Sequence, residues 1–273
     1  MREQLSGSPE GQPRARTRAP QPPAPVARVS ALNGMLRRMS NLLRCVELET
    51  GGVVRSAVIW LHGLGADGHD FEPIVPLLGL DGAGVRFVFP NAPRRAVSIN
   101  MGLLMPAWYD IRGLDAHSAI DLKGIRASGE QVEAIVRREN ERGVPAGSIV
   151  LAGFSQGGVI ALHAALRHPE RLAGVVALST YFVEEASPVA ERCAANRGLP
   201  IFQGHGTDDS MIPLARGIEA RDRLLAIGHP VTFRTYPAEH AVHPEEIAEV
   251  GEFLRAVLAS SGDGARDGAV DGG

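Results

Sequence analysis

Residues 149–158 read IVLAGFSQGG, an apolar run that passes into a G-x-S-x-G pattern centred on Ser155. The apolar run is typical of a strand covered on both faces, and a segment with helical character begins at residue 156. A strand that turns sharply into a helix strains the backbone of the serine. Side chains at the two flanking positions would clash, which explains the two glycines. The stretch therefore predicts a strand–turn–helix unit that exposes the Ser155 hydroxyl beside a helix N-terminus.

Strand-like and helix-like segments alternate on both sides of this unit. Short apolar runs of the same kind lie at 57–61, 85–89, 175–178, 199–202 and 231–236. Segments with helical character lie at 121–141, 156–167, 214–227 and 244–258. This alternation predicts one α/β domain with a mostly parallel central sheet and helices on both faces. In such a sheet the active site lies at the carboxyl ends of the strands, so the loops after the strands carry the candidate residues.

Two of these loops carry the partners that a serine nucleophile needs, which are a base and a carboxylate that orients it. When the serine lies on a strand–turn–helix unit, the order along the chain is serine, then acid, then histidine. Residues 205–213, HGTDDSMIP, supply Asp208 and Asp209, and residues 236–244, YPAEHAVHP, supply His240 and His243. Spacing alone leaves open which acid and which histidine belong to the site.

The loop after the strand at 57–61 is rich in glycine, because residues 62–68 read HGLGADG. In a G-x-S-x-G hydrolase, one oxyanion-binding N–H comes from this loop and one from the residue after the nucleophile. The rule nominates the backbone N–H groups of Leu64 and Gln156 as the oxyanion hole. A phosphate-binding loop is the competing interpretation, but the segment lacks G-x-G-x-x-G and a P-loop lysine. His62 is expected to order the loop.

Composition excludes several other classes of protein. The chain has 273 residues, 44% of them hydrophobic and 22% charged, which is typical of a globular protein with one large domain. Its net charge of −3 gives no indication of nucleic-acid binding. No apolar run approaches the roughly 20 residues that span a bilayer, so no stable membrane insertion is expected. Cys45 and Cys193 lie far apart, which predicts no metal site, no disulfide framework and a cytoplasmic location.

The two ends of the chain differ from the rest. Residues 1–42 are rich in proline and arginine and lack a hydrophobic period, so we expect a disordered N-terminal extension. Two other interpretations stay open, namely a transit peptide, which the prolines disfavour, and a natural start at Met35 or Met39. Residues 260–273 are rich in Gly, Asp and Ala and are expected to form a disordered C-terminal tail. The predicted domain therefore spans residues 43–259.

These motifs resemble the carboxylesterase and acyl-protein thioesterase family, the phospholipase/carboxylesterase family of α/β-hydrolases. The resemblance extends over roughly residues 45–259. It rests on ordered blocks: LHGLGADGHDF at 61–71, PNAP at 90–93, AWYDI at 107–111, GFSQGG at 153–158 and H-G-x-x-D at 205–209. The resemblance implies an α/β-hydrolase fold and a cytosolic serine hydrolase that uses no cofactor and forms a homodimer.

The family pattern also assigns site residues. Carried over position by position, it makes Ser155 the nucleophile, Asp209 the acid, His240 the base, and Leu64 and Gln156 the backbone N–H donors. The family has glycine before its histidine where this chain has Glu239, which keeps His243 as an alternative base. Trp108 and Tyr109 fall in a loop that lies near the acyl or alcohol site in the family, which implies substrate binding. Burial in the core is the alternative for Trp108.

The predicted activity is hydrolysis of small-molecule carboxylic esters with small to medium acyl chains, through an acyl-enzyme intermediate. The strand–loop pattern of residues 57–113 is similar to that of bacterial carboxylesterases, which favours such esters. An acyl-protein thioesterase or lysophospholipase is the alternative, because these enzymes share one machinery and differ in their pockets. A non-catalytic receptor on the same fold is the alternative of another class. Residues 181–198 form either a small cap over the site or a surface excursion.

Overall fold

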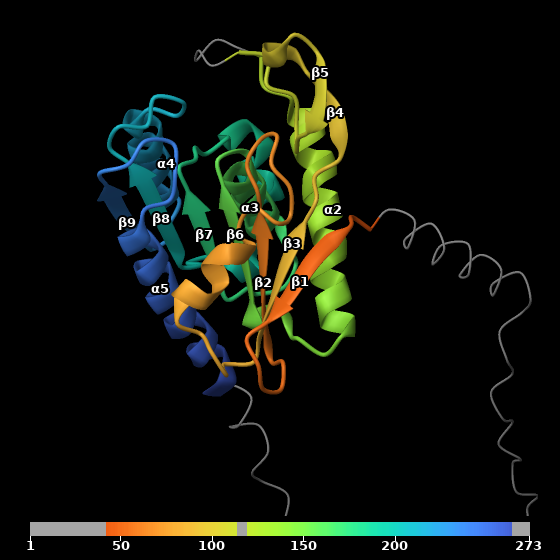
Figure 1. Cartoon of the computed structure of the whole chain (residues 1–273), viewed down its shortest axis with the longest axis vertical. Coiled ribbons are helices and arrows are strands. Elements are labelled where there is room, and N and C mark those ends of the chain that lie inside the picture. The colour runs from red at the N-terminus through yellow and green to blue at the C-terminus, as the bar shows by residue number, and fades with distance from the viewer. Residues whose placement is uncertain (1–41, 114–118, 264–273) are drawn as a thin grey trace, which may run out of the picture. The chain divides into compact units, whose positions relative to one another are not determined.

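The computed structural model describes the backbone of residues 42–113 and 119–263. Within this part of the chain a seven-stranded sheet has the order β1-β3-β2-β6-β7-β8-β9 (Figure 1). Every neighbouring pair of strands is parallel except β1 with β3. The predicted mostly parallel sheet is therefore confirmed. The strands are β1 (Cys45–Glu49), β2 (Ser56–Leu61), β3 (Val85–Pro90), β6 (Ile149–Phe154), β7 (Gly174–Leu178), β8 (Ile201–Gly206) and β9 (Val231–Tyr236).

Helices cover both faces of the sheet, as the sequence predicts. Three of them, α2 (Leu122–Glu141), α3 (Gln156–Arg167) and α4 (Leu214–Ala226), pack on one face. The opposite face is covered by α5 (Pro244–Asp263) and a 3₁₀ helix at Glu72–Leu78. Successive side chains of a strand point to opposite faces. The two apolar layers accordingly take alternate residues of β2: Ala57, Ile59 and Leu61 face the first group, and Val58 and Trp60 face the second.

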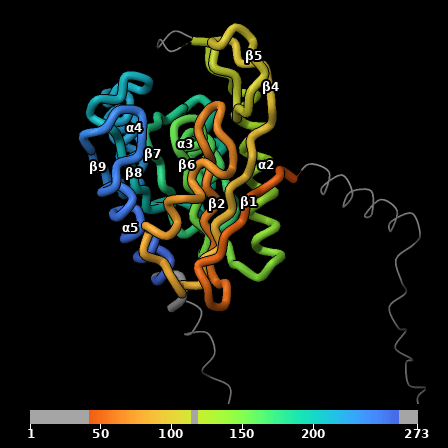
Figure 2. Tube along the Cα trace, viewed as in Figure 1, coloured from red at the N-terminus to blue at the C-terminus, as the bar shows by residue number. Residues whose placement is uncertain are grey.

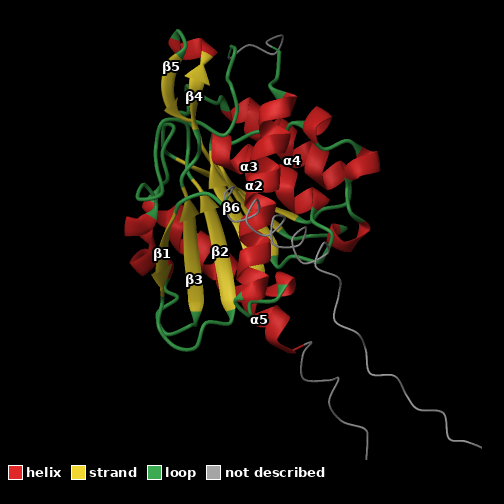
Figure 3. Cartoon of the chain, turned by 90° about the vertical axis from the view of Figure 1, so that its right-hand side faces the viewer, coloured by secondary structure: helices red, strands yellow, loops and turns green. Residues whose placement is uncertain are grey.

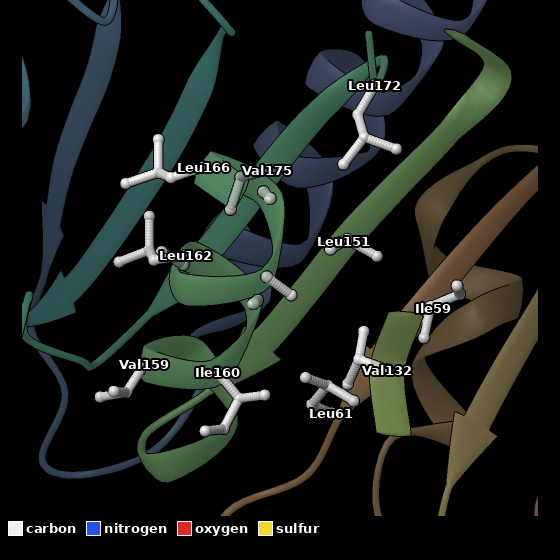
Figure 4. Close-up of a cluster of buried hydrophobic side chains, with 14 of the residues drawn as sticks. Ile59, Leu61, Val132, Leu151, Val159, Ile160, Leu162, Leu166, Leu172 and Val175 are labelled. Atoms are coloured by element: carbon white, nitrogen blue, oxygen red, sulfur yellow. The ribbon is translucent and has the colours of Figure 1, made fainter. Parts of the chain in front are cut away.

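The apolar layer under α3 fixes the helix that begins directly after Ser155. Its buried side chains contact residues of the central strands, and burial of each such side chain is worth roughly 1.5–3 kcal/mol. The position of the helix N-terminus is therefore set by packing along the whole helix. Figure 4 shows Val159, Ile160, Leu162 and Leu166 of this helix with Leu151, Val175 and Ile59 of the sheet.

Two elements were not expected from the sequence. One is β1, a half-exposed edge strand whose CVELE pattern mixes charged and apolar residues. The other is an antiparallel hairpin formed by β4 (Arg94–Val97) and β5 (Leu103–Pro106). The hairpin stands beyond the sheet at the carboxyl ends of its parallel strands (Figure 2, Figure 3). Its strands are short and carry exposed apolar residues, so neither a long run nor an alternating pattern marked them.

The bounds of β8 differ from the expected run at 199–202. The strand begins at Ile201 and continues to Gly206, so His205 and Gly206 belong to the strand and not to the loop after it. Pairing with β9 extends it, because His205 lies opposite Thr235 and Gly206 opposite Tyr236. Glycine is required at position 206, since a Cβ there would overlap the backbone of the loop that carries His240. The glycines interrupt the apolar run by which strands are recognised.

The end of the chain also differs from expectation. Helix α5 continues to Asp263, so the tail predicted from residue 260 begins at least four residues too early. The sequence ASSGD after Leu258 contains no proline, and tertiary packing of the preceding turns carries the helix onward. At the other end, Leu42 already packs against the core. The predicted extension over residues 1–42 therefore ends one residue too late, and its residues 1–41 and the tail from 264 lie outside the described residues. Among the described helices, none is long and apolar enough to cross a membrane.

Glu246 is a buried carboxyl group in the first turns of α5. Its side chain is 1% exposed. One oxygen accepts the backbone N–H of His243 at 3.1 Å, which caps the helix, and the other has no hydrogen-bond partner in the described part of the chain. Burial, together with the nearby charge of Glu249, raises the pKa of Glu246 from 4.5 to about 7.

We expect this carboxyl to make the fold less stable as pH rises. A group whose pKa is higher in the folded chain contributes its full stabilisation below the unfolded value of 4.5 and loses it as pH rises through about 7. Glu246→Gln keeps an acceptor for His243 and removes the titration. Its free energy of unfolding should therefore exceed that of the wild type at about pH 8, by roughly 1–3 kcal/mol, and much less at about pH 5. Urea denaturation measures this, with exposed Glu245→Gln as control. An equal effect at both pH values would contradict it.

Candidate active site

Ser155 lies at the sharp turn between β6 and α3. Its backbone angles are φ 53° and ψ −120°, in a region that residues other than glycine rarely adopt. A Cβ at Gly157 would overlap the Leu61 carbonyl, and one at Gly153 would overlap the backbone of Gly157. The strained turn is held from β7, because the Ser155 N–H donates to the Leu178 carbonyl at 2.9 Å. The predicted strand–turn–helix unit is thus present in the structure.

A continuous series of hydrogen bonds joins Ser155, His240 and Asp209. The Ser155 Oγ lies 2.9 Å from His240 Nε2, and His240 Nδ1 lies 2.7 Å from Asp209 Oδ2. Because a carboxylate accepts, Nδ1 carries the proton and Nε2 is free to accept from the hydroxyl. The Phe154 ring lies 4.8 Å from the His240 ring and supports it from the side. The three polar side chains come from the carboxyl ends of β6, β8 and β9.

Asp209 is buried, yet its surroundings suit a negative charge. Its second oxygen, Oδ1, accepts the backbone N–H groups of Met211 at 2.9 Å and Ile212 at 2.8 Å. The residue is only 5% exposed, so these bonds replace water that a surface carboxylate would have. The turn after β8 therefore holds a carboxylate whose free lone pairs face His240.

The two alternative residues lie outside this series. Asp208 is exposed, and its Oδ2 accepts from the hydroxyl of Thr207 at 3.0 Å. The ring of His243 stacks on Tyr236 at 5.9 Å, and its Nδ1 accepts the Glu245 N–H at 3.3 Å. Among the described residues other than glycine, only Met101, Ser155 and Ser179 have a positive φ. The backbone of Glu239 is thus compatible with a residue other than glycine.

The two backbone donors expected from the sequence flank the turn. Gln156 follows Ser155 at the start of α3, and Leu64 lies in the loop after β2. A Cβ at Gly63 would lie 3.7 Å from Ser155 Cβ, so this loop passes beside the serine. In the described part of the chain, neither the Leu64 nor the Gln156 N–H donates to another group. The loop is tied to the hairpin, because the Gly65 N–H donates to the Pro106 carbonyl at 2.9 Å.

Comparison with known proteins assigns the chain to a family. The family model described as Phospholipase/Carboxylesterase matches residues 48–258. The chain belongs to the phospholipase/carboxylesterase family. It is therefore a member of a hydrolase family that includes esterases and thioesterases, and the predicted resemblance is confirmed.

Several relatives of this phospholipase/carboxylesterase family member carry thioesterase names. Acyl-protein thioesterase 1 of Gibberella zeae is 35% identical over 215 residues, which cover 74% of this chain and 91% of the relative. The solved structure of Zea mays acyl-protein thioesterase 2 has a TM-score of 0.70 at 27% identity and covers 79% of this chain and 99% of its own. Arabidopsis thaliana SOBER1 has a TM-score of 0.70 at 28% identity, covering 75% of this chain and 100% of its own. These similarities confirm the predicted α/β-hydrolase fold.

Trp108 and Tyr109 of this phospholipase/carboxylesterase family member lie in the core, as the alternative for Trp108 anticipates. Their exposed fractions are 0% and 2%. The indole N–H of Trp108 donates to the His62 carbonyl at 2.9 Å, and the Tyr109 hydroxyl lies 2.8 Å from that of Tyr181. Both side chains are therefore buried and hydrogen-bonded to neighbouring parts of the fold in this structure. Direct contact with substrate stays a prediction.

The side chain of Gln156 makes contacts that sequence reasoning missed. Its Oε1 accepts the Trp108 N–H at 2.7 Å, and its Nε2 donates to the Tyr109 carbonyl at 2.8 Å. The buried amide thus joins the first residue of α3 to the loop after β5. A glutamine directly after a nucleophile is the only sequence signal for this contact, and it does not name the partners.

His62 orders the glycine-rich loop, as expected. Its Nδ1 lies 2.7 Å from the Gly63 carbonyl and its Nε2 accepts the Ala92 N–H at 3.1 Å, so Nδ1 carries the proton. Burial lowers the pKa of His62, which keeps the ring neutral and both bonds intact. The ring therefore links the loop after β2 to the segment after β3.

Proposed function

We propose that this protein is a serine esterase that works through an acyl-enzyme, with Ser155 as nucleophile, His240 as general base and Asp209 as the orienting carboxylate. The observation that carries the proposal is the hydrogen-bonded series from Ser155 Oγ through His240 to Asp209 Oδ2, with distances of 2.9 and 2.7 Å. Membership of a hydrolase family supports the same conclusion.

The proposed reaction has two halves. His240 Nε2 takes the proton of Ser155 as Oγ attacks the ester carbonyl, and the N–H groups of Leu64 and Gln156 receive the oxygen that becomes negative. The carbon–oxygen bond to the alcohol then breaks, and the alcohol leaves with the proton from His240. Water, deprotonated by His240, attacks the acyl-enzyme and returns Ser155 to its free form. Asp209 stabilises the His240 cation that forms in each half.

The preferred substrates in this proposal are carboxylic esters with small to medium acyl chains. The alternative is an acyl-protein thioesterase or lysophospholipase, and the thioesterase names of the relatives favour it about equally. Both reactions use the same acyl-enzyme steps and differ only in the group that leaves. The cytoplasmic location and the homodimer stay predictions.

The catalytic proposal is tested by active-site labelling. A fluorophosphonate probe should attach to the wild-type protein, and peptide mass spectrometry should find it on Ser155. Rapid mixing with p-nitrophenyl butyrate should give a burst of p-nitrophenol equal to the enzyme concentration if deacylation is slower than acylation. A folded protein whose Ser155 stays unlabelled and that releases no p-nitrophenol would support the non-catalytic receptor instead.

The substrate class is tested by comparing kcat/KM across acyl lengths. We expect p-nitrophenyl acetate, butyrate and octanoate to be hydrolysed faster than the palmitate. The panel should include butyryl-coenzyme A, an S-palmitoylated peptide and a lysophospholipid. A higher kcat/KM for the palmitoylated peptide than for every short ester would favour the acyl-protein thioesterase. Preference for the lysophospholipid would favour the lysophospholipase.

A further inference from the structure

His205 lies next to the proposed catalytic carboxylate and plays no part in the mechanism above. It is the penultimate residue of β8 and its side chain is completely buried. Gly217 of α4 packs against the ring, and a Cβ at that position would lie 3.0 Å from Cε1 of His205. The ring is therefore confined between the sheet and a helix.

One ring nitrogen of His205 faces the turn that holds Asp209. Nε2 lies 2.8 Å from the Ile212 carbonyl and 3.6 Å from Asp209 Oδ2. Because a carbonyl only accepts, Nε2 carries the proton and donates to Ile212. The N–H of the same Ile212 donates to Asp209 Oδ1 at 2.8 Å. Ile212 is thus held by His205 through its carbonyl while it holds Asp209 through its N–H.

The surroundings of the other ring nitrogen favour a neutral His205. Nδ1 is buried and has no hydrogen-bond partner among the described residues. Burial lowers the pKa of His205, and the nearby His240 lowers it further, against the opposing effects of Asp209 and the Ile212 carbonyl. A neutral ring presents its single N–H to the 209–212 turn.

We propose that His205 is a positioning residue for Asp209, whose Nε2–H closes the 209–212 turn against β8 and fixes the carboxylate in the orientation that meets His240. The two imidazoles flank the same oxygen, because Asp209 Oδ2 lies 2.7 Å from His240 Nδ1 and 3.6 Å from His205 Nε2. The inference rests on the proposed function, since orientation of Asp209 matters only if His240 acts as a base.

The test compares three replacements of His205. Glutamine places an amide N–H three bonds from Cβ, as Nε2 is, whereas asparagine places it one bond short and leucine supplies none. His205→Leu and His205→Asn are expected to lower kcat by between about 10- and 100-fold with little change in KM, because the carboxylate is misplaced. His205→Gln should recover most of the loss. The pKa that governs the acid limb of kcat/KM should fall in the leucine and asparagine variants, because a tilted Asp209 stabilises the His240 cation less.

A matched control separates positioning from loss of stability. His229 is also buried, and its Nδ1 lies 3.2 Å from the Leu199 carbonyl, at the opposite end of β9 from the His240 loop. His229→Leu should lower the melting temperature without moving the pH profile. If His205→Leu does not fold, the glutamine and asparagine pair still decides the matter.

The outcomes distinguish this inference from the function on which it rests. If wild-type Ser155 is neither labelled nor active, the proposed function fails. If the wild type is active but the glutamine and asparagine variants have equal kcat and the same pH profile, the role of His205 is refuted while the esterase remains. A downfield proton resonance from His240 Nδ1–H gives an independent reading. It should shift in the asparagine variant and not in His229→Leu.

Discussion

Replacement of Ser155 by alanine is expected to lower kcat for p-nitrophenyl butyrate by at least about 10⁵-fold. The hydroxyl is the only proposed group that forms a bond with the substrate, and the remaining oxyanion donors give little turnover without it. The fold should survive, because alanine fits the same turn. The variant should also lose fluorophosphonate labelling, and its melting temperature should stay near that of the wild type.

The chain provides a second serine–histidine pair as a control for this experiment. Ser187 is buried, and its Oγ lies 3.1 Å from His163 Nδ1. Burial and the charge of Arg167 lower the pKa of His163 to about 4. No strained turn presents Ser187, so Ser187→Ala should leave kcat and labelling unchanged. If Ser155→Ala kept a tenth or more of the wild-type activity, the assignment of the nucleophile would be wrong.

Asp209→Asn is expected to lower kcat by about 10⁴-fold. An amide at this position would present either a second donor to His240 Nδ1–H or its NH₂ group to the N–H groups of Met211 and Ile212. In the first orientation the imidazole loses the tautomer that accepts the Ser155 proton, and in both orientations its cation loses a negative partner. Stopped-flow acylation and steady-state hydrolysis should show the same loss.

The neighbouring acid makes the comparison specific. Asp208→Asn should leave kcat close to the wild type, because Asp208 is exposed and, among the described residues, its side chain bonds to Thr207 and not to His240. Equal losses in the two variants would mean that total charge near the site matters and the 2.7 Å contact with His240 does not.

The sequence predicted the elements that repeat a strong local pattern. The strand–turn–helix around Ser155 was predictable because its apolar run and its glycines report burial and steric crowding directly. The strand order, by contrast, follows from pairing between distant segments. β1 and the hairpin of β4 and β5 were missed because these strands are short, and their residues are half-exposed and mixed in polarity.

Contacts between side chains from different elements were the least predictable part of the site. Histidine at position 205 was visible, but its position beside Asp209 depends on the extension of β8 and on the contact with Gly217 in α4. The amide of Gln156 finds its partners at 108 and 109, in a loop that no local rule brings close. The sequence spacing could not decide between Asp208 and Asp209 as the acid. In the structure the turn after β8 directs Asp209 toward His240 and leaves Asp208 exposed.

The strand that leads to His240 is the last in the sheet, with a neighbour on one side only. A segment with fewer buried contacts and more exposed backbone hydrogen bonds opens locally at a lower free energy than the core does, and an edge strand has one row of backbone groups without a neighbouring strand. Ser155, by contrast, follows a central strand paired on both sides. Moderate heating should therefore displace His240 from the site by local opening at β9, while β6 and the turn that holds Ser155 remain folded. On heating, the rate of ester hydrolysis should therefore fall at a lower temperature than the circular dichroism signal of the fold.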